Sequence, residues 1–266
     1  MNLLAVTLSR AVRLELSFVI QWIAELYVLL SFIGVVAYSV TQARAGRLLR
    51  NANNPPPWMI SPVTGWFFVL CILNLLFLQS FLYMVLIVLG TAFLLIENRR
   101  SVWDQFGLER MSPISLFKWS LYVCGAVILI ELPLIWGSEK IMTALHIPHP
   151  EQESVMLFRQ FNRPAQIFDF LLQAVVISPM IEELFFRGFL LTFLKNYTSP
   201  WLALLLSAGV FAFAHVNLGS ALPLWFLGIV LGIAYEHTGC LLLPIGIHAC
   251  FNLMTAVSLL LDKGVS

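Results

Sequence analysis

The chain has 266 residues, of which 60% are hydrophobic and 11% are charged, and its mean hydropathy is +0.89. Soluble domains carry about 25% charged residues, so this composition excludes a soluble globular protein and predicts a multi-pass protein whose surroundings are a lipid bilayer. The formal net charge of +1 and the lack of a long basic run argue against a nucleic-acid partner.

The N-terminal region is predicted to hold apolar segments joined by polar connectors. Leu16–Val40 is long enough for one span, because about 20 apolar residues cross a bilayer. Val63–Ile96 fits either one long span or two short ones, which leaves the orientation of the chain open. Glu97–Pro113 mixes charged and aromatic residues and is predicted to be a surface connector. The next predicted span is Ile114–Trp136.

Gly137–Arg163 is the longest polar stretch, and it completes an N-terminal region, residues 1–163, of membrane helices and connectors. Its two histidines, His146 and His149, are expected to be solvated loop residues and not metal ligands. The chain has four cysteines without a CxxC pair, so we expect small buried hydrophobic residues and no disulfide or metal site. These cysteines are Cys71, Cys124, Cys240 and Cys250.

Residues 164–266 form the second predicted region, with four apolar runs at Pro164–Leu194, Trp201–Val216, Leu222–Tyr235 and Leu241–Leu261. The second and third runs are short for spans, which is typical of helices inside a bundle around a water-filled cavity. The predicted fold is therefore all-α, a transmembrane bundle of about seven or eight helices with a polar cavity among the C-terminal helices.

The first of these runs carries charges that are costly in a membrane. Glu182 and Glu183 each cost about 2.5 to 3.5 kcal/mol near a bilayer centre. Glu183 and Arg187 are spaced i,i+4 with the acid first, which favours an ion pair, while Glu182 lies about 100° away around the helix axis. Pro179 removes one helical hydrogen bond, so we expect a kink and a freed carbonyl at Val175.

Two later runs each carry polar side chains at the same spacing. Phe211 and His215 share one helix face, and His248 and Asn252 share another. Polar groups from three separate apolar helices can therefore converge on one site.

These three motifs, in this order, resemble the CPBP family of intramembrane proteases, which includes type II CAAX prenyl proteases and abortive-infection proteins. The residues that carry the resemblance are Glu182-Glu183-x-x-x-Arg187, Phe211-x-x-x-His215 and His248-x-x-x-Asn252. The resemblance covers about the last 100 residues. It implies an intramembrane endopeptidase that acts on a membrane-associated protein or peptide, such as a prenylated CAAX protein or a peptide precursor.

The resemblance also implies a role for each polar residue. Glu182 and His215 would orient and deprotonate a water molecule. His248 and Asn252 would stabilise the oxyanion. Glu183 and Arg187 would support that site.

A metal is the open point of the chemistry. Glu182, His215 and His248 can together hold zinc and leave a fourth position for water. The chain has no HExxH motif, however, and each of these ligands lies on a different helix. We therefore favour a glutamate-activated water without a metal, and zinc is the alternative.

Two other classes of function compete with the protease. One is a non-catalytic membrane scaffold or immunity factor of the same fold, and the other is a proton-coupled transporter. The complete set of motif residues favours the enzyme, and the lack of an internal repeat disfavours the transporter. The expected location is a bacterial cytoplasmic membrane.

Overall fold

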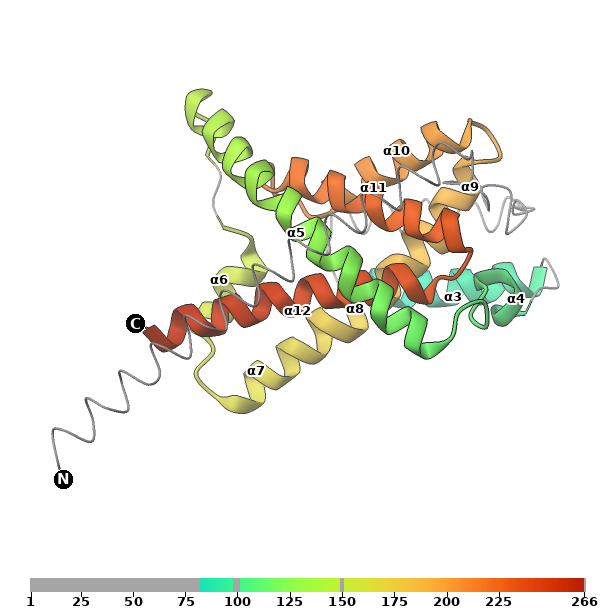
Figure 1. Ribbon diagram of the computed structural model, residues 1–266, viewed down its shortest axis with the longest axis horizontal. Coiled ribbons are helices and arrows are strands. Elements are labelled where there is room, and N and C mark those ends of the chain that lie inside the picture. The colour runs from blue at the N-terminus through green and yellow to red at the C-terminus, as the bar shows by residue number, and fades with distance from the viewer. Residues whose placement is uncertain (1–81, 98–100, 149–150, 266) are drawn as a thin grey trace, which may run out of the picture.

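The computed structural model describes residues 82–97, 101–148 and 151–265, and all regular structure in these ranges is helical (Figure 1). The prediction of an all-α bundle of seven or eight helices is confirmed, because the described residues form eight helices when Pro164–Leu194 is counted as one. The predicted span Leu16–Val40 and the first part of Val63–Ile96 lie outside these ranges, as do Cys71 and His149.

The helices before the three motifs are α3 (Leu82–Glu97), α4 (Val102–Phe106), α5 (Pro113–Ala144) and α6 (Glu153–Gln160). The continuous helix that follows consists of α7 (Pro164–Leu171), the π-helical segment η2 (Leu172–Ile177), α8 (Ser178–Glu183), the π-helical segment η3 (Leu184–Leu191) and α9 (Thr192–Leu194). The last three helices are α10 (Pro200–Ala214), α11 (Ala221–Thr238) and α12 (Leu242–Val265).

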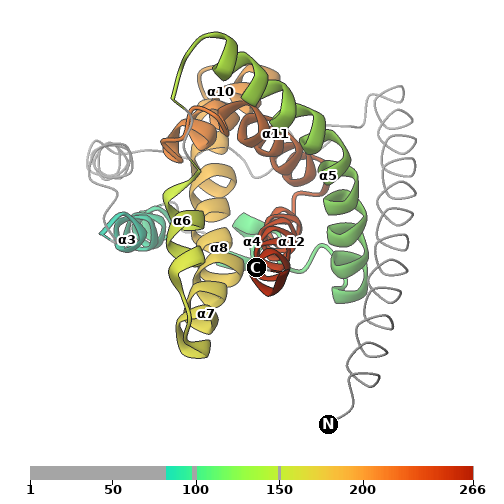
Figure 2. The same ribbon diagram turned by 90° about the vertical axis from the view of Figure 1, so that its left-hand side faces the viewer.

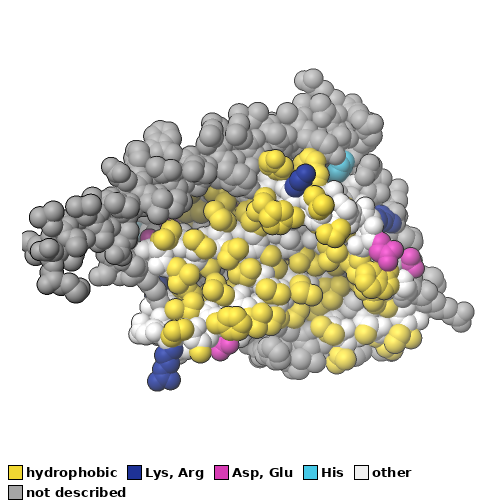
Figure 3. Space-filling view, turned by 60° about the horizontal axis from the view of Figure 1, so that its bottom comes forward, with side chains coloured by type: hydrophobic (Ala, Val, Ile, Leu, Met, Phe, Trp, Pro, Cys, Tyr) yellow, Lys and Arg dark blue, Asp and Glu magenta, His cyan; other side chains and the backbone are white. Residues whose placement is uncertain are grey.

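Among the described helices, three are long and apolar enough to cross a membrane: α5, α11 and residues Leu242–Asp262 of α12. α10 is apolar but shorter. Figure 3 shows hydrophobic side chains over most of the described surface of one face, with the few charged side chains near its margins. Exposing so large an apolar face to water would be unfavourable, whereas lipid can cover it. The chain is therefore an integral membrane protein.

α5 corrects the predicted limits of its span. The helix continues from Pro113 to Ala144, and α6 follows, so much of the stretch predicted as a polar loop is helical. A tertiary contact accounts for the extension: Ser138 is buried, and its hydroxyl donates to the Gly219 carbonyl at 2.5 Å. The sequence analysis predicted a polar stretch outside the helix because Gly219, the partner of Ser138, is 81 positions away and could not be recognised from local polarity.

The connector before α5 is only partly at the surface. Trp103 is 60% exposed, as predicted for an interfacial segment, but Phe106 is 2% exposed and belongs to the hydrophobic core. Its carbonyl accepts from the Leu241 amide at 2.9 Å, and its ring packs against Gly188. This connector therefore braces the turn between α11 and α12, which the prediction of a surface segment missed.

The helices around the motifs cross closely because small residues lie at the crossings. Gly228 of α11 lies against Ala208 of α10, where an added Cβ would come within 3.0 Å of the alanine. Gly246 of α12 lies directly against Ser120 of α5. Figures 1 and 2 show α12 running beside α8, while α5 crosses α12 on its way toward α11. The three motif helices are thereby held around one interior point.

Candidate active site

Both π-helical segments lie next to the two glutamates. In η2 the Ser178 amide donates to Gln173 O, five residues back, as a π-helix requires. A wider π-helical turn therefore lies just before Pro179, where the sequence predicted a kink. In this register the acceptor facing position 179 is the carbonyl of Ala174, one residue before the predicted Val175, and proline has no N–H to donate to it.

In the second π segment, η3, two backbone carbonyls accept hydrogen bonds from side-chain hydroxyl groups. Ser207 of α10 donates to Phe186 O at 3.0 Å, and Thr192 donates to Arg187 O at 3.3 Å. Both hydroxyl side chains are buried. The wider helical turn therefore keeps its backbone satisfied while it carries Arg187 toward the interior.

Glu183 and Arg187 form the predicted ion pair. Arg187 Nη1 lies 2.7 Å from Glu183 Oε1, and the two side chains are 1% and 0% exposed. Arg187 Nη2 also donates to the Gly228 carbonyl on α11 at 3.0 Å. The guanidinium lies 4.7 Å from the ring centre of Phe211, within range of a cation–π contact. Arg187 therefore joins its own helix to α10 and α11.

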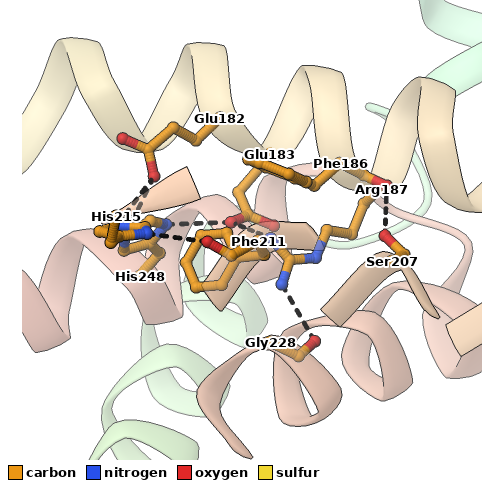
Figure 4. A network of polar contacts seen from close by, with 9 residues as sticks. All are labelled: Glu182, Glu183, Phe186, Arg187, Ser207, Phe211, His215, Gly228 and His248. Atoms are coloured by element: carbon orange, nitrogen blue, oxygen red, sulfur yellow. Dashed lines mark hydrogen bonds and ion pairs between the residues drawn. The ribbon is translucent and has the colours of Figure 1, made fainter. Parts of the chain in front are cut away.

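His248 lies between the two glutamates (Figure 4). Its Nδ1 is 2.9 Å from Glu183 Oε1, and its Nε2 is 3.9 Å from Glu182 Oε2. Because Glu183 Oε1 already accepts from Arg187, it is an acceptor toward His248 as well, so His248 Nδ1 carries the hydrogen. The other ring nitrogen is thereby directed at Glu182.

His215 approaches Glu182 from α10. Its Nδ1 lies 2.8 Å from the Phe211 carbonyl, which can only accept, so this nitrogen carries the hydrogen. Its Nε2 then presents a lone pair 4.0 Å from Glu182 Oε2. The Phe211 ring packs edge-on against His215 at 4.9 Å and against His248 at 5.7 Å, so it holds both imidazoles in place.

Glu182 is the least enclosed member of this cluster. Its side chain is 17% exposed, yet Oε2 is buried and has no hydrogen-bond partner among the described residues. The two histidine Nε2 atoms are the groups that face it. As the helix geometry predicted, one glutamate is held by the arginine and its neighbour points elsewhere.

Asn252 lies one turn beyond His248, but its amide is directed elsewhere. Nδ2 donates to the carbonyl of Ala174 in η2 at 2.8 Å. The structure therefore brings five of the six predicted residues into one cluster of contacts, and it connects Asn252 to the helix that carries the glutamates.

Sequence reasoning missed several residues that hold this region together. Gly228 and Ser207 act through a carbonyl and a hydroxyl, for which no motif exists. Lys195 and Glu236 form a second buried ion pair at 2.7 Å, close to the end of α11, where Gly239 caps the helix at φ 65°. The ion pair joins residues 41 positions apart, which local spacing cannot predict.

The fold and these contacts define a helical integral membrane protein with a buried cluster of Glu, His and Arg at the meeting point of its C-terminal helices. Residues 164–254 match the family model described as type II CAAX prenyl endopeptidase Rce1-like. This match confirms the resemblance predicted from the three motifs, and the family that it names indicates an intramembrane protease. No curated protein and no solved structure matches the chain.

Proposed function

We propose that this protein is an intramembrane endopeptidase in which Glu182 and His215 activate a water molecule. The observation that carries the proposal is the arrangement around Glu182 Oε2. This buried oxygen has no protein partner in the described ranges, and two imidazole nitrogens face it at 4.0 Å and 3.9 Å. A buried carboxylate oxygen without a donor is costly, so a small polar molecule at this point would relieve the cost.

The spacing of these three atoms fits a water molecule better than a zinc ion. A water at hydrogen-bond distance from two atoms 4.0 Å apart would subtend an angle of about 90°. Zinc bonds of about 2.0 to 2.1 Å to the same atoms would require an angle of about 150°, far from tetrahedral. Within the residues described, no group of three or more His, Cys, Asp or Glu is placed to hold a metal ion. The three groups would have to move closer together to bind zinc.

Charge balance assigns a proton to His248. The cluster holds two carboxylates and one guanidinium, so a second positive charge would neutralise it in this apolar setting. His248 contacts Glu183 directly and faces Glu182, and an imidazolium there would donate from both nitrogens. One water could then accept from His248 and donate to Glu182 and to His215. The water would make three hydrogen bonds, which is typical of a buried water, and its second lone pair would be left for the attack.

In the proposed reaction, the oxygen of this water attacks the carbonyl carbon of the scissile peptide bond. Its proton passes to Glu182 or to the lone pair of His215. The carbonyl oxygen gains negative charge and accepts the Nε2–H of His248, which stabilises the tetrahedral intermediate. The C–N bond then breaks, and the proton held by Glu182 or His215 passes to the leaving amine. Glu183 and Arg187 keep His248 oriented throughout.

The substrate class follows from the surroundings of the cluster. The catalytic helices lie among apolar helices, and the described surface is apolar over most of one face, so a substrate would reach the site from the membrane. A prenylated peptide with a CAAX end or a membrane-associated peptide precursor meets this requirement. The family match supports the CAAX type.

The test is cleavage of a farnesylated peptide with a CAAX terminus by the full chain in liposomes. Glu182→Gln should lower cleavage by at least about 100-fold, because the amide cannot accept the proton and His215 alone remains to do so, while the protein remains folded. Glu131→Gln is the matched control: Glu131 is also a buried helix carboxylate, 3% exposed, but it lies on α5 and makes none of the contacts of the cluster. It should retain activity.

Two results would count against the proposal. Cleavage by folded Glu182→Gln at the rate of the unmodified chain would remove Glu182 from the reaction. If Glu131→Gln loses as much cleavage activity as Glu182→Gln, the loss reflects damage to folding that any buried carboxylate would cause, and it says nothing about the reaction. A comparison of membrane proteomes with and without Glu182→Gln would identify the natural substrate if the farnesylated peptide is not cleaved.

A further inference from the structure

The amide of Asn252 is directed at the backbone of the glutamate-bearing helix. Nδ2 donates to Ala174 O at 2.8 Å, across 78 positions of sequence. The side chain is partly buried at the place where α12 runs beside η2. The contact therefore joins the helix of His248 to the helix of Glu182 and Glu183.

The Ala174 carbonyl requires such a partner because of two features of its own helix. The Ser178 amide, the normal α-helical donor, is bonded to Gln173 O in the π turn. The next residue along the chain is Pro179, which has no N–H. Neither donor reaches Ala174 O, and a carbonyl without a donor is costly in an apolar bundle.

We infer that Asn252 is a positioning residue: its amide caps the carbonyl left open by the π turn and Pro179, and so sets the position of the two glutamates relative to His248. The contact lies eight residues before Glu182 on one continuous helix. Ala174 and Glu182 lie on the same unbroken helix, so a shift of the backbone at Ala174 is carried along the helix to Glu182. Loss of the amide would move Glu182 Oε2 away from the two histidine nitrogens that it faces at about 4 Å.

A double-mutant cycle between Asn252 and Pro179 tests this inference without any substrate. Asn252→Ala should lower the folded-to-unfolded ratio in mixed micelles by about 3- to 15-fold, the usual range for a hydrogen bond between membrane helices. Pro179→Ala supplies a backbone N–H and removes the ring that blocks an α-helical turn, so Ala174 O gains a donor in either register. In that background Asn252→Ala should change the ratio by less than about twofold.

Ser207→Ala is the matched control for the cycle. Ser207 also donates a side-chain hydrogen bond to a π-segment carbonyl, that of Phe186, but on η3. Its removal should destabilise the protein by the same amount with and without Pro179. If Asn252→Ala lowers the folded-to-unfolded ratio by the same factor with and without Pro179→Ala, the inference is overturned. If Asn252→Ala alone does not fold, recovery of folding by Pro179→Ala supports the inference, and no recovery overturns it.

Kinetics separate positioning from a purely structural role, and this second arm rests on the proposed function. In folded Asn252→Ala protein, kcat for the farnesylated peptide should fall about 100-fold, as for catalytic groups displaced by about 1 Å, with little change in KM. An unchanged kcat would overturn the inference. The two arms fail separately: if the unmodified chain does not cleave the peptide, the proposed function fails, while the stability cycle still decides whether Asn252 caps Ala174.

Discussion

Arg187→Met is the substitution whose effect can be worked out most fully from the structure. Arg187 is 1% exposed and donates to Glu183 at 2.7 Å and to Gly228 O at 3.0 Å. Methionine keeps much of the apolar stem but removes both donors, so the Glu183 carboxylate is left buried with His248 as its only partner in the described structure. Breaking a buried ion pair in this way costs about 3 to 5 kcal/mol.

That cost is a large fraction of the stability of a typical protein, which is about 5 to 15 kcal/mol. It corresponds to a fall of about 100- to 4000-fold in the folded-to-unfolded ratio. Arg187→Lys should recover only part of it, because a single ammonium cannot reach Glu183 and the Gly228 carbonyl as the planar guanidinium does. Adding Glu183→Gln to Arg187→Met should also recover part, because the stranded charge is then removed.

The assay is equilibrium unfolding of the full chain in mixed micelles. Arg159→Met is the matched control: Arg159 also pairs with a glutamate, Glu151, at 3.1 Å, but the two side chains are 42% and 51% exposed. Solvent screens that pair, so its loss should leave the unfolding midpoint unchanged. The reasoning is refuted if Arg187→Met is no more destabilised than this surface control, or if adding Glu183→Gln makes the loss larger.

Three further predictions concern the metal and two other packing sites. Phenanthroline should leave cleavage unchanged, because the spacing at the cluster fits water; loss of activity that added zinc restores would identify the facing groups as zinc ligands. Gly107→Ala should lower the free energy of unfolding by about 1 to 3 kcal/mol, because φ is +58° and an added Cβ would collide with Gly239 O. Gly137→Ala on α5 is the control: an added Cβ there meets open space, so the change should be neutral or stabilising in the same assay. Lys195→Met should cost about 3 to 5 kcal/mol in that assay by stranding the buried Glu236, and a change below 1 kcal/mol would show that this pair does not matter.

Interactions within one helix were the ones that the sequence predicted well. The Glu183–Arg187 pair follows from i,i+4 spacing, and the different direction of Glu182 follows from the 100° step between neighbours. The all-helical membrane class follows from composition, because an apolar chain in lipid must satisfy its backbone locally. Each of these depends on residues that are close in sequence or on the chain as a whole.

The tertiary structure decided which groups meet across helices. The π turn before Pro179 shifted the open carbonyl by one residue and gave it Asn252 as a partner, whereas α-helical counting had pointed to Val175. The position of His248 between the two glutamates likewise depends on how α12 lies against α8. The extension of α5 and the burial of Phe106 were also missed from the sequence.

The membrane class, the helical fold and the set of motif residues could thus be predicted from the sequence, because they depend on composition and on spacing along single helices. The contacts of each residue became known from the folded arrangement, because helix crossings depend on small residues such as Gly228 and Gly246, whose partners lie on other helices. The same reason explains why Asn252 was expected to face the substrate while its amide donates to a neighbouring helix.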